Sequence, residues 1–355
     1  MKRRLKLALL WVARSAGLFA LARQVTRGKL RIICYHGFEA VDEARFRPKL
    51  FMKSETFGAR VHAIQRMGFN VLSLDAAVDA MYRATLPDRA LVITVDDGFA
   101  AFATAAVPAL KRHGFPATVY VTTYYSSRQT PVFRLVVQYM FWKTRRESIT
   151  IGPPLCAVER QVDLRGGEAA SAAMWDCIMH GERSADEVGR QEILRWLGDL
   201  LEVPYAPIVD LRMFGLLSLE EIERLAHDGF DVQLHTHRHT FPADNEERAK
   251  SEIVENRRVL SDAVERPLVH FCYPSGVWAA NQFRWLDELG IRSSTTCIPG
   301  LNDAHVPRHA LRRFLDGEDV HFLEFEAELS GFSELLRQLR GVPAAQPRLS
   351  HRVEG

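Results

Sequence analysis

The chain has 355 residues, of which 47% are hydrophobic and 25% charged, values typical of a soluble globular protein with one large or two smaller domains. The formal net charge of +2 argues against a nucleic-acid-binding protein, and we expect no nucleic acid among its partners. Five cysteines, without a Cys-x-x-Cys pair, argue against a disulfide framework or a thiolate zinc site and favour a reducing compartment.

Residues 1–28 are predicted to form a basic amphipathic helix. Nine Lys or Arg residues and no acid precede Glu39, and Arg14 interrupts apolar stretches that are too short for a membrane span. We expect this helix either to contact an anionic membrane surface or to pack on the rest of the protein. The expected location is then cytoplasmic, at the inner face of the membrane. A signal peptide cleaved after residues 20–22 (ALA) is the alternative.

Strand-like and helix-like segments alternate along most of the remaining chain. The predicted strands are residues 30–36, 90–97, 117–123, 231–235, 268–274 and 292–297. The predicted helices are residues 54–69, 101–115, 218–230, 245–264 and 281–290, with Ser54 as a cap and with Ser218 and Glu221 as a capping box. Apolar strands with crossover helices indicate a parallel sheet covered by helices, either a barrel or an open sheet. Active sites of both folds lie at the carboxyl ends of the strands.

The alternation breaks down between residues 130 and 215. We interpret this stretch as an insertion that covers one side of the active-site end, as a substrate lid would. One domain is expected over residues 29–340, and residues 341–355 are expected to be a flexible tail.

Two adjacent carboxylates, Asp96 and Asp97, end the predicted strand of residues 90–97. Like charges side by side repel each other unless something neutralises them. Adjacent residues of a strand point to opposite sides, so one aspartate can bind a metal ion while the other acts as a base. An N-cap of the helix that follows would explain one carboxylate but not both.

Three histidines, His235, His237 and His239, follow the strand of residues 231–235. In a helical turn or tight loop, His235 and His239 lie on one side and can share a cation; along a continuing strand, His235 and His237 would share a face. Two histidines and one carboxylate form a common ligand set for a catalytic divalent metal, and they leave a position open for water.

Three segments are similar, in this order, to the motifs of the polysaccharide deacetylases of the NodB-homology type, carbohydrate esterase family 4. They are residues 94–98 (TVDDG), 235–239 (HTHRH) and 271–276 (FCYPSG), with further likeness at 32–38 (IICYHGF) and 311–314 (LRRF). The resemblance implies a distorted (β/α) barrel of about seven parallel strands. It also implies a metal-dependent hydrolase that removes an N-acetyl or O-acetyl group from a polysaccharide, oligosaccharide or lipid-linked sugar in cell-envelope glycan synthesis.

The resemblance assigns roles to individual residues. Asp97, His235 and His239 would bind the divalent metal, most often Zn²⁺, and Asp96 would be the general base. A backbone N–H near Tyr273 would help to hold the oxyanion, and Pro274 and His36 would lie in the substrate-binding region.

The chain departs from the family pattern at two points. The arginine that orients the base is replaced by Cys272, and Arg313 is the candidate substitute, with Arg312 and Arg308 as alternatives. The family's late histidine, which supplies the general acid, has no clear equivalent. Candidate general acids are His309, which we take as the first choice, His305 and His36.

Other functions remain open at this point. A deformylase of a lipid-linked amino sugar or a cyclic amidase would keep the fold and the metal but change the amide. A catalytically inactive carbohydrate-binding relative is a third hypothesis. A glycosidase is excluded, because adjacent carboxylates cannot flank a glycosidic bond at the ~5 Å or more that its mechanism requires.

Overall fold

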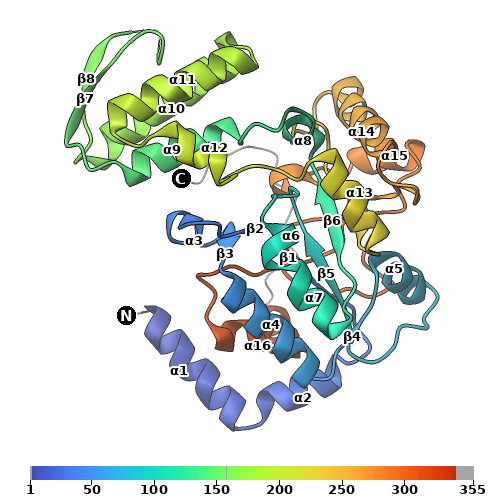
Figure 1. Ribbon diagram of the computed structural model, residues 1–355. Helices are drawn as coiled ribbons and strands as arrows, with labels where there is room; N and C mark the ends of the chain where they lie inside the picture. The colour runs from blue at the N-terminus through green and yellow to red at the C-terminus, as the bar shows by residue number, and fades with distance from the viewer. Residues whose placement is uncertain (1, 157, 341–355) are drawn as a thin grey trace.

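The computed structural model describes residues 2–156 and 158–340 (Figure 1). Its centre is a sheet of parallel strands in the order β11-β10-β9-β6-β5-β1-β12, and β4 pairs with β5 off this path. The strands are β1 Arg31–Tyr35, β4 Asn70–Val71, β5 Ala90–Val95, β6 Thr118–Val121, β9 Asp231–Leu234, β10 His270–Cys272, β11 Ser293–Thr295 and β12 Phe314–Leu315. The seven strands of the path curl with helices around them, which confirms the predicted α/β fold, a distorted (β/α) barrel with an insertion.

The two edges of the sheet meet at one short segment, residues 311–315. Leu311 forms a parallel bridge with Thr295 of β11, and Phe314 of β12 pairs in parallel with Ile33 of β1. The segment therefore passes from one edge of the sheet to the other and curls it towards closure. The sequence did not predict this strand, because two residues beside a pair of arginines show no strand periodicity.

Helices cover the outside of the sheet (Figure 1). They are α4 Ser54–Arg66, α5 Leu74–Tyr82, α6 Phe102–Ala105, α7 Val107–His113, α13 Leu219–His227, α14 Glu246–Leu260, α15 Gln282–Glu288, α16 Phe322–Ser330 and α17 Phe332–Leu339. Every residue of β5 is buried, which explains its continuous apolar run.

Helix termini test several predictions. The capping box of α13 is confirmed, since Ser218 and Glu221 each accept a backbone N–H from the other residue. Ser54 is not a cap; it is the first residue of α4, and its hydroxyl donates to the carbonyl of Ala105. The single helix predicted at 101–115 is two helices, α6 and α7. Pro108 near the start of α7 lacks the N–H that would continue the hydrogen bonding of α6.

The predicted insertion forms a lobe beside the sheet (Figure 1). It contains α9 Phe133–Lys143, β7 Ser148–Ile151, β8 Arg160–Asp163, α10 Gly167–Ser184, α11 Glu187–Leu201 and α12 Tyr205–Asp210, and α8 Thr123–Arg128 leads into it from β6. Its core is a separate apolar cluster that includes Val136, Cys177 and Leu197. The lobe contacts the segment after β1. This segment forms β2 Gly37–Phe38, α3 Glu43–Phe46 and β3 Phe51–Met52. The contact includes a hydrogen bond from the Tyr139 hydroxyl to Asp42.

The single helix predicted at residues 1–28 is two helices, α1 Lys2–Ser15 and α2 Leu18–Val25, bent by 74°. Gly17 at the break has a φ of 77°, a left-handed conformation that glycine adopts without strain. No single helix in the described ranges is long and apolar enough to cross a membrane; the bent pair passes that test by length and composition only. The predicted tail, 341–355, lies outside the described residues.

A buried ion pair fixes the chain just after β12. Arg60 of α4 donates from Nε to Oδ2 of Asp316 at 3.0 Å and from Nη2 to the carbonyl of Val320 at 2.6 Å. The backbone N–H of Asp316 donates to the carbonyl of Cys34 in β1. Burial raises the pKa of Asp316 to about 7 although Arg60 opposes the shift.

The variant Arg60→Met is expected to lower the free energy of unfolding at pH 8 by about 3–5 kcal/mol, because it leaves a buried carboxylate without its partner. At pH 5 the buried carboxyl of Asp316 in the folded variant binds a proton, whereas the same carboxyl in the unfolded chain, with its ordinary pKa, does not. The loss of stability should therefore be smaller at pH 5 than at pH 8. Denaturant unfolding at both values measures this difference.

The double variant Arg60→Met/Asp316→Asn should regain part of the stability at pH 8, since no unpaired charge remains. Arg83→Met is the control, because the Arg83 side chain is 77% exposed, and it should change stability by less than about 0.5 kcal/mol. Equal losses at both pH values in Arg60→Met would contradict the assignment of the buried charge.

Candidate active site and metal centre

Predicted site residues from three strands meet at the carboxyl end of the sheet. His36 directly follows β1, Asp96 and Asp97 follow β5, and His235 follows β9. β1 pairs with β5 up to Tyr35 opposite Val95, so the next residues, His36 and Asp96, emerge side by side. The strand order thus places these polar side chains together.

Asp97, His235 and His239 form a compact group of potential metal ligands. Oδ1 of Asp97 lies 3.1 Å from Nε2 of His235 and 3.3 Å from Nε2 of His239. The backbone turns sharply to achieve this, with φ values of 70° at Asp97 and 55° at His239. A left-handed conformation is unfavourable for residues with a side chain and is often found at functional sites.

The chemistry of these donors fits a divalent cation. Nδ1 of His235 lies 2.8 Å from the carbonyl of Cys272, to which it can only donate, so Nε2 is the nitrogen directed at Asp97. Burial lowers the pKa of His235, but Cys272 and Asp97 outweigh burial and raise it. Burial raises the pKa of Asp97, but the hydrogen bonds of His235 and His239 outweigh it and hold this pKa well below its usual range. Two imidazole nitrogens and one carboxylate oxygen within 3.3 Å are a donor set that suits a divalent cation.

The ligand group is also open to solvent on one side. The side chain of His235 is 2% exposed, whereas those of Asp97 and His239 are 17% and 40% exposed. Two imidazoles and one carboxylate with an open side resemble a catalytic rather than a structural zinc site.

Helix α14 holds the histidine loop from behind. The side chain of Asn256 is fully buried; its Oδ1 accepts the N–H of His235 at 2.9 Å, and its Nδ2 donates to the carbonyl of Val121 and to Oγ1 of Thr123. Thr123 Oγ1 in turn lies 2.9 Å from Nδ1 of His237, which faces away from the ligand group. Glu252, one turn earlier, accepts the backbone N–H groups of residues 237 and 238.

The sequence analysis missed Asn256 and Glu252, although a signal was present. Asn256 lies on the same helical face as Ala249, Ile253 and Leu260, all of which are buried. A polar side chain within such an apolar stripe must find a partner in the interior, because an unsatisfied buried amide is costly.

Asp96 faces a different partner. Arg313 donates from Nη1 to Oδ1 and from Nη2 to Oδ2 of Asp96, both at 2.7 Å, and neither side chain is more than 3% exposed. The thiols of Cys272 and Cys34 also donate to Oδ2, at 3.2 and 3.4 Å. Burial would raise the pKa of Asp96, but Arg313 outweighs it and lowers this pKa far below its usual range. Asp96 is therefore an ionised carboxylate in a fixed plane.

The structure brings Arg313, and neither alternative arginine, to Asp96. The guanidinium of Arg312 lies 3.9 Å from Glu334, and that of Arg308 lies over the ring of Tyr82.

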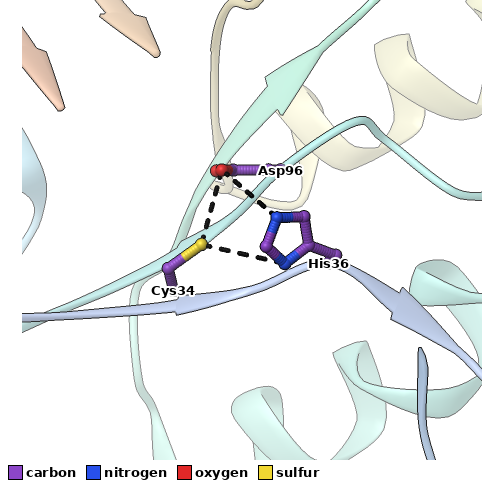
Figure 2. Close-up of side chains that lie close together, drawn as sticks. All are labelled: Cys34, His36 and Asp96. Atoms are coloured by element: carbon purple, nitrogen blue, oxygen red, sulfur yellow. Dashed lines mark hydrogen bonds and ion pairs between the residues drawn. The ribbon is translucent and has the colours of Figure 1, made fainter. Parts of the chain in front are cut away.

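His36 lies on the other side of Asp96, with Nε2 3.8 Å from Oδ2 of Asp96 and Nδ1 4.0 Å from Sγ of Cys34 (Figure 2). Burial lowers the pKa of His36, whereas Asp96 and Asp97 oppose this shift. Cys34, His36 and Asp96 are close enough to bind an ion. However, both oxygens of Asp96 already accept from Arg313, whose charge would repel a second cation. The group at Asp97 is the better metal site.

His309, the first-choice general acid, lies elsewhere, and this prediction is corrected. Its Nδ1 is 3.0 Å from Oγ of Ser294, and its Nε2 is 2.9 Å from Oδ1 of Asp287. Neither ring nitrogen is directed at Asp96 or Asp97.

An oxyanion donor in the loop near Tyr273 stays a prediction, but the polar groups of Tyr273 itself are engaged elsewhere. Its backbone N–H donates to the carbonyl of Thr295, and its hydroxyl donates to the carbonyl of His309. Pro274 is buried and begins the 3₁₀ turn Pro274–Gly276, and it has no N–H to donate. These residues shape the loop after β10 instead.

The variant Asn256→Ala is expected to weaken zinc binding by about 10–100-fold, because it frees the backbone of His235 and leaves buried groups unpaired. Competition with a chelating dye measures the affinity. Asn281→Ala is the matched control, since that exposed asparagine only donates to the carbonyl of Ala243. Unchanged zinc affinity in folded Asn256→Ala would show that α14 does not position the ligand.

The family model "Polysaccharide deacetylase" matches residues 83–144 and 206–294. This range includes all three sequence motifs and leaves out most of the insertion. No curated protein sequence matches the chain.

Solved structures share the fold. The Streptococcus pyogenes deacetylase PplD in complex with acetate has a TM-score of 0.56 at 15% identity, over 86% of this chain and 99% of that one. IcaB from Ammonifex degensii has a TM-score of 0.53 at 16% identity, over 85% and 97% of the two chains. The Bacillus cereus polysaccharide deacetylase BC0361 has a TM-score of 0.52 at 15% identity, over 85% and 69%. The match of the family model, on the residues that carry the motifs, confirms the resemblance to the polysaccharide deacetylases of the NodB-homology type.

Proposed function

We propose that the chain is a metal-dependent hydrolase that removes an N-acetyl or O-acetyl group from a polysaccharide, an oligosaccharide or a lipid-linked sugar of the bacterial cell envelope. The observation that carries the proposal is the separation of the two adjacent carboxylates. Asp97 faces two histidines, whereas Asp96 is held by Arg313 and faces His36. The family match and the fold shared with PplD and IcaB support the same reaction class.

Asp97, His235 and His239 would hold the cation, and zinc suits this mixture of nitrogen and oxygen ligands. When bound, a divalent cation polarises the acyl carbonyl and lowers the pKa of water. Asp96 would accept the proton of the attacking water. Its carboxylate is ionised and fixed in orientation by Arg313, so it needs no reorganisation before the reaction.

His36 is the best-placed general acid. Its imidazole adjoins Asp96, and its side chain is 17% exposed, so substrate can reach it. In the proposed reaction a carbon–oxygen bond forms from water and the carbon–nitrogen bond breaks. The proton of water passes to Asp96, and His36 gives a proton to the leaving nitrogen, which yields acetate and a free amine.

The same residues would hydrolyse other amides. A deformylase or cyclic amidase needs the same base, acid and cation, so the released acid distinguishes these activities. An inactive carbohydrate-binding protein is disfavoured because it has no use for a buried base beside a complete ligand set.

We further propose a cytoplasmic location at the inner face of the membrane. The free cysteines support a reducing compartment, since Cys34 and Cys272 would be thiols that donate to Asp96. Export through an N-terminal signal is the alternative.

Three variants test the roles of the carboxylates. Asp97→Ala and His239→Ala should lose the bound metal, measured by elemental analysis of the purified protein. Asp96→Asn should keep the metal but lose turnover by about 10²–10⁴-fold, because the carboxylate base is removed while the three ligands remain. Turnover is measured as acid release from a panel of acetylated oligosaccharides.

Acetate release supports the deacetylase, and formate release favours the deformylase. A wild-type protein that binds no divalent metal under any loading condition would overturn the proposal.

The variant His36→Gln should lower kcat by about 10²-fold or more while the metal content stays unchanged. His309→Gln is the matched control, since this histidine contacts Ser294 and Asp287 rather than the ligand group. Its kcat should remain close to that of the wild type. The reverse result, with His309→Gln inactive and His36→Gln active, would restore His309 as the acid.

A further inference from the structure

Helices α1 and α2 present large apolar side chains to solvent. Figure 1 shows the two helices at the outer edge of the molecule, beside α16. The exposed side chains are Leu5, Leu9, Trp11, Val12, Leu18, Leu21 and Val25. Within each helix most of them are three, four or seven residues apart, so they form a stripe along one face. We call these seven residues the outward face.

Some charged residues of α1 face the domain instead. Lys6 donates to Glu324 of α16 at 2.6 Å, and Arg14 lies 3.0 Å from Glu326 of the same helix. Apolar contacts on that inner side form a small cluster, in which Leu10, Ala13 and Phe19 pack with Ala327, Leu323 and Phe332. A helix of a soluble protein normally buries its apolar stripe and exposes its charges. Here ion pairs and a small apolar cluster hold the helix to the domain, and no residue that the structure describes covers the apolar stripe.

We propose that the outward face binds the surface of an anionic phospholipid bilayer. Neither helix is long enough to span a membrane, and the 74° bend separates the two stripes into short segments, which suits helices that lie in the interface. A tryptophan, Trp11, lies at the border of the stripe, as is common at the membrane surface.

The positive charge of α1 and α2 favours a bilayer over a second copy of the chain as the partner of the outward face. Helices α1 and α2 contain no acidic residue, and Arg3, Lys6 and Arg14 keep 51–62% of their side chains exposed although they pair with α16. Two copies that met through this face would bring two such cationic segments together, and these would repel each other. The negative surface potential of an anionic leaflet attracts the same cations.

The outward face begins at the catalytic end of the barrel. Arg3, in the first turn of α1, donates to the backbone carbonyl of Asp319, and the N–H of Asp319 donates to the carbonyl of Pro48. These residues belong to the segments that follow β12 and β1, the ends of the strands where Asp96 and Asp97 lie. A bilayer on the outward face therefore lies close to the site. If the proposed function holds, a lipid-linked saccharide would reach it without leaving the membrane.

Vesicle co-sedimentation of the full chain tests the proposal. The wild type should bind vesicles of phosphatidylglycerol and phosphatidylcholine, bind pure phosphatidylcholine more weakly, and dissociate as NaCl is raised. The double variant Leu9→Glu/Leu21→Glu should bind the anionic vesicles at least about tenfold more weakly, because it places carboxylates within the stripe. Leu9→Ser/Leu21→Ser serves the same purpose if the first variant does not fold.

Val188→Glu/Leu211→Glu is the matched control. These apolar residues of the insertion are as exposed as Leu9 and Leu21, and their replacement should leave binding unchanged. Absence of wild-type binding to anionic vesicles, or equal loss in the control, would overturn the proposal. A wild-type dimer that the Leu9/Leu21 variant dissociates would assign the face to a second copy instead. Vesicle binding needs no turnover, so its failure is distinguishable from failure of the proposed hydrolase.

Discussion

The ion pair between Arg313 and Asp96 joins the closure of the sheet to the chemistry of the site. Arg313 lies on the segment that connects the two edges of the sheet, and it reaches Asp96 at the end of β5. Its remaining donors are also satisfied, Nε by the carbonyl of Thr296 and Nη1 additionally by Thr94. A buried pair of charges is tolerated only when it is hydrogen-bonded in this way, and removing one partner typically costs about 3–5 kcal/mol. The closure of the sheet and the orientation of the proposed base therefore depend on the same contact.

This ion pair also allows a second carboxylate at the adjacent position. Asp96 is neutralised by a permanent cation, so it adds little repulsion to Asp97. The backbone then turns to a positive φ at Asp97, which directs this side chain to His235 and His239 rather than to Arg313. The two aspartates are neighbours in sequence but lie in different electrostatic environments. The division that we propose, into a metal ligand and a base, requires both the turn and the arginine.

The positions of six strands and the group of Asp97, His235 and His239 could be predicted from the sequence, whereas the histidine beside Asp96 could not. Continuous apolar runs identify buried strands, and the polar residues after them identify the site. Which histidine meets Asp96 depends on the order of strands in the sheet. β1 is the neighbour of β5, and this pairing places His36 beside Asp96. His309 is close in sequence to residues 311–315, which join the two edges of the sheet, yet its ring contacts Ser294 of β11. Periodicity within a segment carries no information on strand order, so the sequence left both histidines open.

The cysteine at position 272 and the arginine at position 313 are complementary. Sγ of Cys272 lies 3.1 Å from Nη2 of Arg313 and 3.2 Å from Oδ2 of Asp96, in a position that is fully buried. The commoner family motif has arginine at the position of Cys272. A second guanidinium there would compete for the same carboxylate and would bring two like charges together away from solvent. The small neutral thiol of Cys272 leaves room for the guanidinium of Arg313, which lies on residues 311–315. In this chain Arg313 supplies the positive charge beside Asp96, and the carboxylate that we propose as the base stays ionised.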